Sequence, residues 1–229
     1  KKKNPKIFTI HIQDPKVNFA NFDMIIAPEH DNLKGNNVYN SKGAIHYITD
    51  LEIKNARQYL ANKINSEKIV SLILGGPNKY YSFKPDQITY IFNQIKSIFV
   101  SNGYKVLVIP SMRTPKEIID LSIKEMGSCG YVVNKVDKQA YLSAYALANY
   151  VIVTCDSTSM ISEAATSGKP IFVAHMKTKK NNYRFKRFFE LFKQMGITRD
   201  LGEKVETWTY NKHNEAQRIA LEIKNKIKN

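Results

Sequence analysis

The chain has 229 residues, 43% of them hydrophobic, and a formal net charge of +15 at pH 7. Its length and composition suit one large or two small globular domains, and no stretch approaches the roughly eighteen uncharged apolar residues of a membrane-spanning helix. The basic start lacks the apolar segment and cleavage site of a secretory signal, so we expect a cytoplasmic protein.

The first 50 residues predict strands, but they are too few for a complete α/β domain. Apolar runs at 7–12 and 22–28 indicate two strands, and 36–48 contains a third candidate. Residues 51–68 carry apolar side chains at helical spacing and predict a helix that links this part to the rest of the chain. We therefore expect residues 1–50 to be the tail end of an α/β domain.

From residue 69 onward, short apolar runs alternate with helical patterns. The runs are typical of strands buried on both faces and lie at 69–74, 106–109, 131–133, 151–154 and 171–173. The helical patterns lie at 85–101, 115–126, 137–148 and 158–167. Thr114, Pro115 and Glu117 predict a capping box at the start of the second helix. This alternation predicts an α/β fold with a right-handed, doubly wound parallel sheet, and 183–195 and 214–228 predict two further helices.

Ligands of open parallel sheets bind beyond the carboxyl ends of the strands, where loops meet helix N-termini. After the first strand of this sheet come Gly75 and Gly76, which allow backbone to approach a ligand closely, and Asn78 and Lys79, which are placed to meet a phosphate. An ordinary turn explains the same residues equally well. After the second strand, Arg113 suits either a bidentate phosphate contact or a solvated surface position.

The fourth strand is followed by a polar turn and a helix of small residues. Asp156 and Ser157 are candidates for the helix cap, and the hydroxyls of Ser157 and Ser159 suit a phosphate. Glu163 lies more than one turn inside the helix, where it is no cap and where a carboxylate suits the hydroxyls of a ribose. The alternative is that Asp156, Ser157 and Thr158 only cap the helix and that Glu163 faces water.

This stretch, DSTSMISEAATSGKPIFV, resembles the nucleotide-sugar-binding signature of GT-B-type glycosyltransferases, which have two facing Rossmann-like domains. The sequence is still more similar to the "elongated mitochondria" family of mitochondrial fission proteins and its proteobacterial relatives. The segments that carry this similarity are IQDPKVNFANFDMIIAPEHD, GNNVYNSKGAIHYIT, ILGGPNKYY, PSMRTP and RFKRFFELFKQMGITRDL. They extend over nearly the whole chain.

The resemblance implies a GT-B glycosyltransferase-like fold with an incomplete N-terminal domain. Residues 1–50 would be the remnant of that domain, 69–200 the nucleotide-sugar-binding domain, and 201–229 a C-terminal helix packing back toward the first domain. The diphosphate of the donor would contact Gly75, Gly76, Ser157 and Ser159, and the ribose would contact Glu163.

The implied activity is glycosyl transfer from a nucleotide-diphospho-sugar to an envelope or lipid-linked acceptor, without a metal or a separate cofactor. The alternative is a non-catalytic interaction or membrane-surface adaptor related to the mitochondrial fission family. The resemblance also implies that a catalytic base comes from the first domain. There, His30 and Asp31 follow an apolar strand, and histidine is the natural general base near neutral pH. A histidine of an ordinary turn is equally consistent, and Gln13 and Asp14 at another strand end have the same two interpretations.

Residues 177–193 combine phenylalanines at helical spacing with lysines and arginines. They predict either a helix on an anionic membrane, peripheral on its inner face, or, as we favour, a helix that buries its phenylalanines on the sheet domain. We expect no specific nucleic-acid partner, because no recognised motif accompanies the positive charge. Cys129 and Cys155 lie at neither disulfide nor metal-ligand spacing, so we expect two buried, reduced cysteines and no metal.

Overall fold

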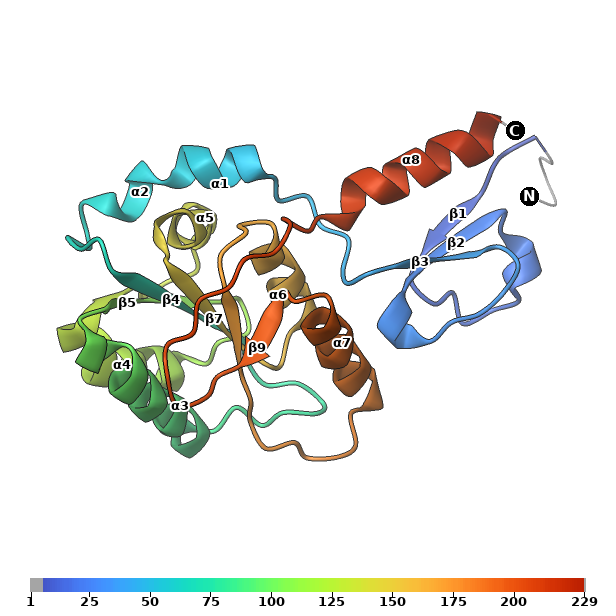
Figure 1. Cartoon of the computed structure of the whole chain (residues 1–229). Coiled ribbons are helices and arrows are strands. Elements are labelled where there is room, and N and C mark those ends of the chain that lie inside the picture. The colour runs from blue at the N-terminus through green and yellow to red at the C-terminus, as the bar shows by residue number, and fades with distance from the viewer. Residues whose placement is uncertain (1–5, 229) are drawn as a thin grey trace.

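The computed structural model describes residues 6–228 and contains two parallel β-sheets (Figure 1). The smaller sheet has the order β1-β2-β3, formed by β1 (Ile10–Ile12), β2 (Met24–Pro28) and β3 (Val38–Ser41). Two short 3-10 helices, η1 (Phe19–Asn21) and η2 (Glu29–Asp31), precede and follow β2. The central strand is buried from Met24 to Ala27, so it forms the core of this part.

The larger sheet has six parallel strands in the order β6-β5-β4-β7-β8-β9. The strands are β4 (Ile69–Leu74), β5 (Lys105–Pro110), β6 (Gly130–Val132), β7 (Tyr150–Thr154), β8 (Ile171–Ala174) and β9 (Thr198–Asp200). The chain builds outward from β4 to β6 on one side and then returns to add β7, β8 and β9 on the other. The point where this order reverses lies between β4 and β7, which is where such sheets bind ligands.

Helices cover both faces of the larger sheet, as the doubly wound pattern predicts. One face packs on α3 (Pro85–Ile98) and α4 (Lys116–Met126), with η3 (Val100–Asn102) and η4 (Gly127–Cys129) at their ends. The other face packs on α5 (Lys138–Leu147), α6 (Thr158–Ala165) and α7 (Tyr183–Gln194), with α1 (Asp50–Ala56) and α2 (Gln58–Ala61) outside α5.

The last helix, α8 (Glu215–Lys228), lies along the smaller sheet (Figure 1). Its Ile219 is buried with Met24 and Ile26 of β2. The chain thus crosses between the two sheets twice, before α1 and before α8. The crossings are held together by an ion pair between Lys212 and Asp50 and by other contacts of the same two segments.

Two expectations about local structure were wrong. The larger sheet has a sixth strand, β9, which the sequence does not announce because it has only three residues and two of them are exposed at the sheet edge. The capping box at Thr114 does not form: α4 begins at Lys116, its N-cap is Pro115, and no side chain caps it. Among residues 6–228, no helix is both long and apolar enough to span a membrane.

Candidate functional site

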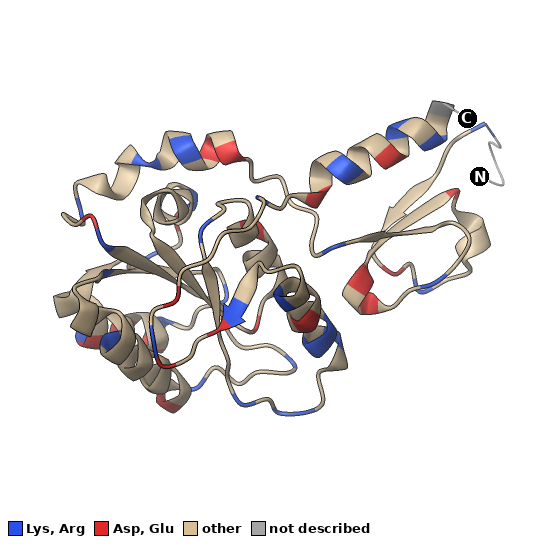
Figure 2. Ribbon diagram, viewed as in Figure 1, with Lys and Arg blue, Asp and Glu red and all other residues tan. Residues whose placement is uncertain are grey.

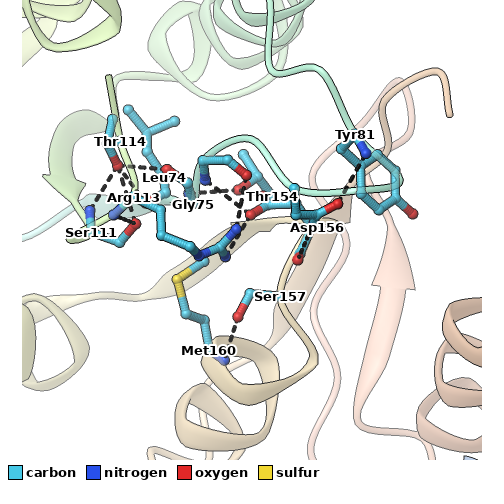
Figure 3. A network of polar contacts seen from close by, with 12 residues as sticks. Leu74, Gly75, Tyr81, Ser111, Arg113, Thr114, Thr154, Asp156, Ser157 and Met160 are labelled. Carbon is cyan, nitrogen blue, oxygen red and sulfur yellow. Dashed lines mark hydrogen bonds and ion pairs between the residues drawn. The ribbon is translucent and has the colours of Figure 1, made fainter. Parts of the chain in front are cut away.

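The loops after β4 and β7 meet at the reversal point of the strand order (Figure 3). The amide of Gly75 donates a hydrogen bond to Thr154 Oγ1 at 2.8 Å, and the amide of Gly76 donates to Asp156 Oδ2 at 2.9 Å. The carboxyl ends of the two strands are therefore joined by direct contacts, and the polar residues predicted after each strand belong to one site.

Asp156 is the centre of this network. Its side chain is fully buried, and it also accepts hydrogen bonds from Thr154 Oγ1 at 2.7 Å and Arg113 Nη2 at 2.8 Å. Burial raises the pKa of the Asp156 carboxyl, and the bonds from Thr154, Gly76 and Arg113 oppose that shift. A carboxylate with these donors holds the two loops together, so its position is structural and its predicted ligand contact stays a prediction.

The two glycines are required by their neighbours in the fold. A Cβ atom on Gly75 would lie 2.0 Å from Asp156 Oδ2, and one on Gly76 would lie 2.0 Å from the carbonyl oxygen of Arg113. Both distances are far inside van der Waals contact. The absence of side chains therefore lets Asp156 and Arg113 close on the loop, an explanation that the sequence alone did not suggest.

Thr114, expected to cap α4, instead stabilises the end of β4. Its hydroxyl contacts the carbonyl oxygens of Leu74 at 3.1 Å and Gly75 at 2.6 Å (Figure 3). Asn78 is engaged in a similar way, because its amide nitrogen donates to the carbonyl oxygen of Asp156 at 2.9 Å and its side-chain oxygen accepts from the amides of Tyr80 and Tyr81. The phosphate contact predicted for Asn78 would compete with these bonds.

Of the two candidates for the helix cap, Ser157 is the N-cap of α6, and its hydroxyl accepts a hydrogen bond from the amide of Met160 at 3.3 Å (Figure 3). A hollow of about 470 Å³ opens beside it. We call it the donor hollow, after the ligand that the sequence predicts here, and its polar and aromatic residues include Asn78, Lys79, Tyr80, Arg113, Asp156, Ser157 and Arg184. The first turn of α6 carries no acidic side chain, so the positive end of the helix dipole is not offset from within the helix.

Glu163 lies roughly 9 Å along α6 from Ser157, given the rise of the helix. It does not simply face water: its Oε2 atom accepts a hydrogen bond from Tyr141 Oη of α5 at 2.5 Å. Burial raises the pKa of Glu163, and the bond from Tyr141 opposes the shift. Ser159, one turn earlier on the same face, is exposed and lines a second hollow.

This second hollow, of about 120 Å³, lies between the strand ends of the smaller sheet and the start of α6. His30, Gln13 and Arg184 line it together with Ser159. His30 is 2% exposed, and neither of its ring nitrogens has a hydrogen-bond partner in the described part of the chain. Burial above all, with the nearby charge of Arg184, lowers the pKa of His30 from 6.5 to about 4, so the imidazole is neutral at pH 7.

Asp31, the second candidate from the smaller sheet, is ion-paired with Arg184 Nε. It lines a third hollow, of about 570 Å³, together with Gln13, Asp14 and several cations. Asp14 is itself paired with Lys16 at 2.5 Å. Of the residues predicted to bind the ligand, the structure brings Asn78, Arg113, Asp156 and Ser157 to the donor hollow and Ser159 to the second hollow beside His30. Gly75, Gly76 and Glu163 line none of these three hollows, whereas Arg184 lines all three.

The family model described as mitochondrial fission ELM1 matches residues 1–227. The chain belongs to this family. The mitochondrial fission protein ELM1 of Arabidopsis thaliana is 23% identical over 254 residues, covering 96% of this chain and 58% of that protein. An uncharacterized protein of Rickettsia prowazekii is 27% identical over 268 residues, covering 100% of this chain and 75% of that protein. The resemblance read from the sequence motifs is confirmed.

Solved structures of the GT-B type have a similar fold. The UDP-GlcNAc 2-epimerase of Methanocaldococcus jannaschii has a TM-score of 0.51 and 12% identity, covering 96% of this chain and 71% of that chain. The S. aureus MnaA–UDP structure has a TM-score of 0.50 and 13% identity, covering 88% of this chain and 52% of that chain. This member of the ELM1 family is therefore a Rossmann-like α/β protein of GT-B type, and it spans between about half and three quarters of the length of these relatives.

Three residues of the site were missed from the sequence. Thr154 was counted as a strand residue, Tyr141 as a helix residue, and Arg184 as part of a basic surface. None of the three carries a strong local signal, because threonine is common in strands and the contacts of Thr154 and Tyr141 are with residues far along the chain. In the described residues there is no cluster of three or more histidine, cysteine or acidic side chains that would hold a metal. Cys155 is buried as expected, but Cys129 is partly exposed, contrary to expectation, because it lies at the end of η4.

Proposed function

We propose that this chain binds a nucleotide-diphospho-sugar in the donor hollow, with the diphosphate at the N-terminus of α6. The observation that supports this most is that three cations, Lys79, Arg113 and Arg184, meet the N-terminus of α6 in one hollow, against one fully buried carboxylate in the lining, that of Asp156. Two phosphates carry negative charge that such an arrangement stabilises. The structures of similar fold include a UDP-GlcNAc 2-epimerase and MnaA with UDP, which is consistent with that ligand class.

The cations of the hollow are only partly neutralised by the protein itself. Arg113 is paired with Asp156, but its side chain is still 41% exposed, and Arg184, paired with Asp31, is also 41% exposed. Both can therefore reach a ligand while keeping their partners. Lys79 is exposed and its ammonium lies over the ring of Tyr80, 4.9 Å from the centroid. A bound diphosphate would draw all three together.

Glu163 is the proposed contact of the ribose hydroxyls. Its carboxylate is partly desolvated, which costs stability at neutral pH, and the bond from Tyr141 offsets that cost only in part. A carboxylate kept at such a position favours a role that a neutral side chain would not fill, since polar strain of this kind concentrates at binding sites.

The proposed reaction is metal-independent transfer of the glycosyl group to a hydroxyl of an envelope or lipid-linked acceptor. His30 is the candidate base, because its neutral imidazole lies in the hollow next to Ser159 and, within residues 6–228, makes no hydrogen bond through either nitrogen. The base would take the hydroxyl proton as the acceptor oxygen bonds to the sugar and the bond to the diphosphate breaks. The cations of the donor hollow would stabilise the leaving diphosphate.

Attachment of residues 177–193 to a membrane is less well supported. Phe185, Phe188 and Phe192 of α7 are buried, at 4%, 0% and 0% exposure, so they are not available to enter a lipid surface. Charged residues, both basic and acidic, remain on the outer face of α7 (Figure 2). An adaptor that uses this face would depend on charge alone.

Calorimetric titration of UDP, UDP-GlcNAc and the GDP- and CMP-linked sugars tests the proposal. We expect one of these ligands to bind and Ser157→Ala and Arg113→Gln each to weaken it about tenfold or more, since each removes a polar contact to a charged ligand. Ser128→Ala, on an exposed turn far from the site, is the matched control and should leave affinity unchanged. Failure of every nucleotide to bind would favour the non-catalytic adaptor instead.

A further inference from the structure

A fourth hollow lies at the amino ends of the strands of the larger sheet, opposite the donor hollow. It has a volume of about 520 Å³, within the usual range for small-molecule sites. It includes the turn of Gly168 and Lys169, which leads into β8 from its amino end, whereas the donor hollow follows the carboxyl ends of the strands. The two hollows are therefore separate.

Four cations from three segments line this hollow. Lys54 and Arg57 come from α1 and its end, Lys169 from the turn before β8, and Lys212 from the segment before α8. Figure 2 shows the change along α1 from acidic residues at its start to basic residues further on. Asp50 is the carboxylate of the lining, so positive charge is in clear excess there.

Three of these four cations have ion-pair or hydrogen-bond partners within the protein. Lys54 and Lys212 are ion-paired with Asp50, and Arg57 donates a hydrogen bond to the carbonyl oxygen of Ala146 at 2.5 Å. Lys169 differs: among residues 6–228, no hydrogen-bond or ion-pair partner faces its ammonium group. Partial burial lowers the pKa of Lys169, and the charges of Arg57 and Lys212 lower it further.

The conformation of the turn at Gly168 and Lys169 brings Lys169 close to Lys212. Gly168 has a φ of +71°, a conformation that favours glycine, and a Cβ atom there would lie 3.1 Å from Lys212 Cγ. Tyr210 Oη donates a hydrogen bond to the carbonyl oxygen of Lys169 at 2.8 Å, which fixes the turn. The positive charges of Arg57 and Lys212 therefore act on Lys169, and a bound anion would stabilise the group.

The walls of the hollow are largely apolar. Ile53 and Tyr145 are buried side chains that line it, and Tyr210 is partly buried beside them. An inorganic anion would leave these walls in contact with water. A ligand that carries its charge at one end and an apolar or aromatic body at the other matches both features.

From this arrangement we infer a binding site for a small phosphomonoester with an apolar body, whose phosphate contacts Lys169, Arg57 and Lys212. A phosphomonoester carries close to two negative charges at pH 7, so it would interact with this group of cations more strongly than a ligand with one carboxylate, which carries a single charge. The site is independent of nucleotide binding in the donor hollow.

Calorimetric titration with phenyl phosphate tests this site. We expect phenyl phosphate to bind more tightly than inorganic phosphate, and Lys169→Gln to weaken phenyl phosphate at least tenfold. Lys204→Gln, which removes the same charge from an exposed position, should leave the affinity unchanged. Lys169→Arg keeps the cation and should retain binding, so it remains informative if the glutamine variant does not fold.

A further variant separates this site from the donor hollow. Ser157→Ala should leave phenyl phosphate binding intact. Equal affinity of the wild type and Lys169→Gln would overturn the inference, and so would loss of binding in Ser157→Ala with binding kept in Lys169→Gln. Absence of any phenyl phosphate binding by the wild type would overturn it as well, without bearing on the proposed nucleotide site.

Discussion

Replacement of Asp156 by alanine should destabilise the protein by about 3 kcal/mol, because the network at the strand ends depends on this carboxylate. The variant leaves the amide of Gly76 and the hydroxyl of Thr154 buried without an acceptor. Each buried, unpaired donor costs about 1–3 kcal/mol. Arg113 adds less, because its side chain is 41% exposed and can turn to water. Relief of the desolvation that raises the pKa of Asp156 offsets part of the loss.

Urea denaturation followed by circular dichroism gives the free energy of unfolding directly. Asp120→Ala is the matched control: Asp120 is paired with Lys116 at 2.6 Å on α4, but its side chain is 57% exposed. Its loss should change stability by less than about 0.5 kcal/mol. A cost below about 1 kcal/mol for Asp156→Ala would refute the structural role assigned to the carboxylate.

Three further outcomes follow from burial and pKa. Burial raises the pKa of Glu163 above its unfolded value of 4.5. The contribution of this group to stability is therefore full below pH 4.5 and is lost as the pH rises through the folded pKa. Glu163→Gln should have a larger free energy of unfolding than the wild type when both are unfolded with urea at pH 7. The pKa of His30 is lowered from 6.5 to about 4, so the contribution of His30 to stability is full above pH 6.5 and falls by up to roughly 3 kcal/mol as the pH drops toward 4. His30→Asn should make the free energy of unfolding less dependent on pH in this range. An unchanged pH dependence would contradict this expectation. Phe188→Ala should lower the free energy of unfolding in urea by about 3–5 kcal/mol, because the side chain is buried, and should leave binding to anionic vesicles unchanged. Loss of vesicle binding in a variant that still folds would instead support the membrane interpretation of α7.

The parts of the fold that repeat a local pattern could be predicted from the sequence. Apolar runs predict β4 and β7, and the polar turn after β7 predicts a helix cap at Asp156 or Ser157, of which Ser157 is the one that forms. The three-residue strand β9 carries too few residues for such a pattern. The start of α4 was not predictable from local spacing, because Thr114 has the spacing of a cap residue and yet its hydroxyl contacts the end of β4.

The division of labour within the site depends on tertiary contacts that no local pattern contains. Asp156 and Ser157 are adjacent and both polar, but one is buried under Gly75 and the other caps a helix at the edge of the donor hollow. Likewise, the partner of Glu163 is Tyr141, which lies 22 positions away on another helix. Arg184 reaches the site from α7, far along the chain from either loop.

The central claim is that a nucleotide-diphospho-sugar binds at the N-terminus of α6. Hydrogen exchange followed by mass spectrometry, with and without a saturating nucleotide sugar, locates the ligand on the chain. Slower exchange in 75–79 and 157–165, with unchanged exchange in α4 as an internal reference, is the expected result. Binding that leaves exchange in both segments unchanged, or that protects other parts of the chain instead, would contradict the claim.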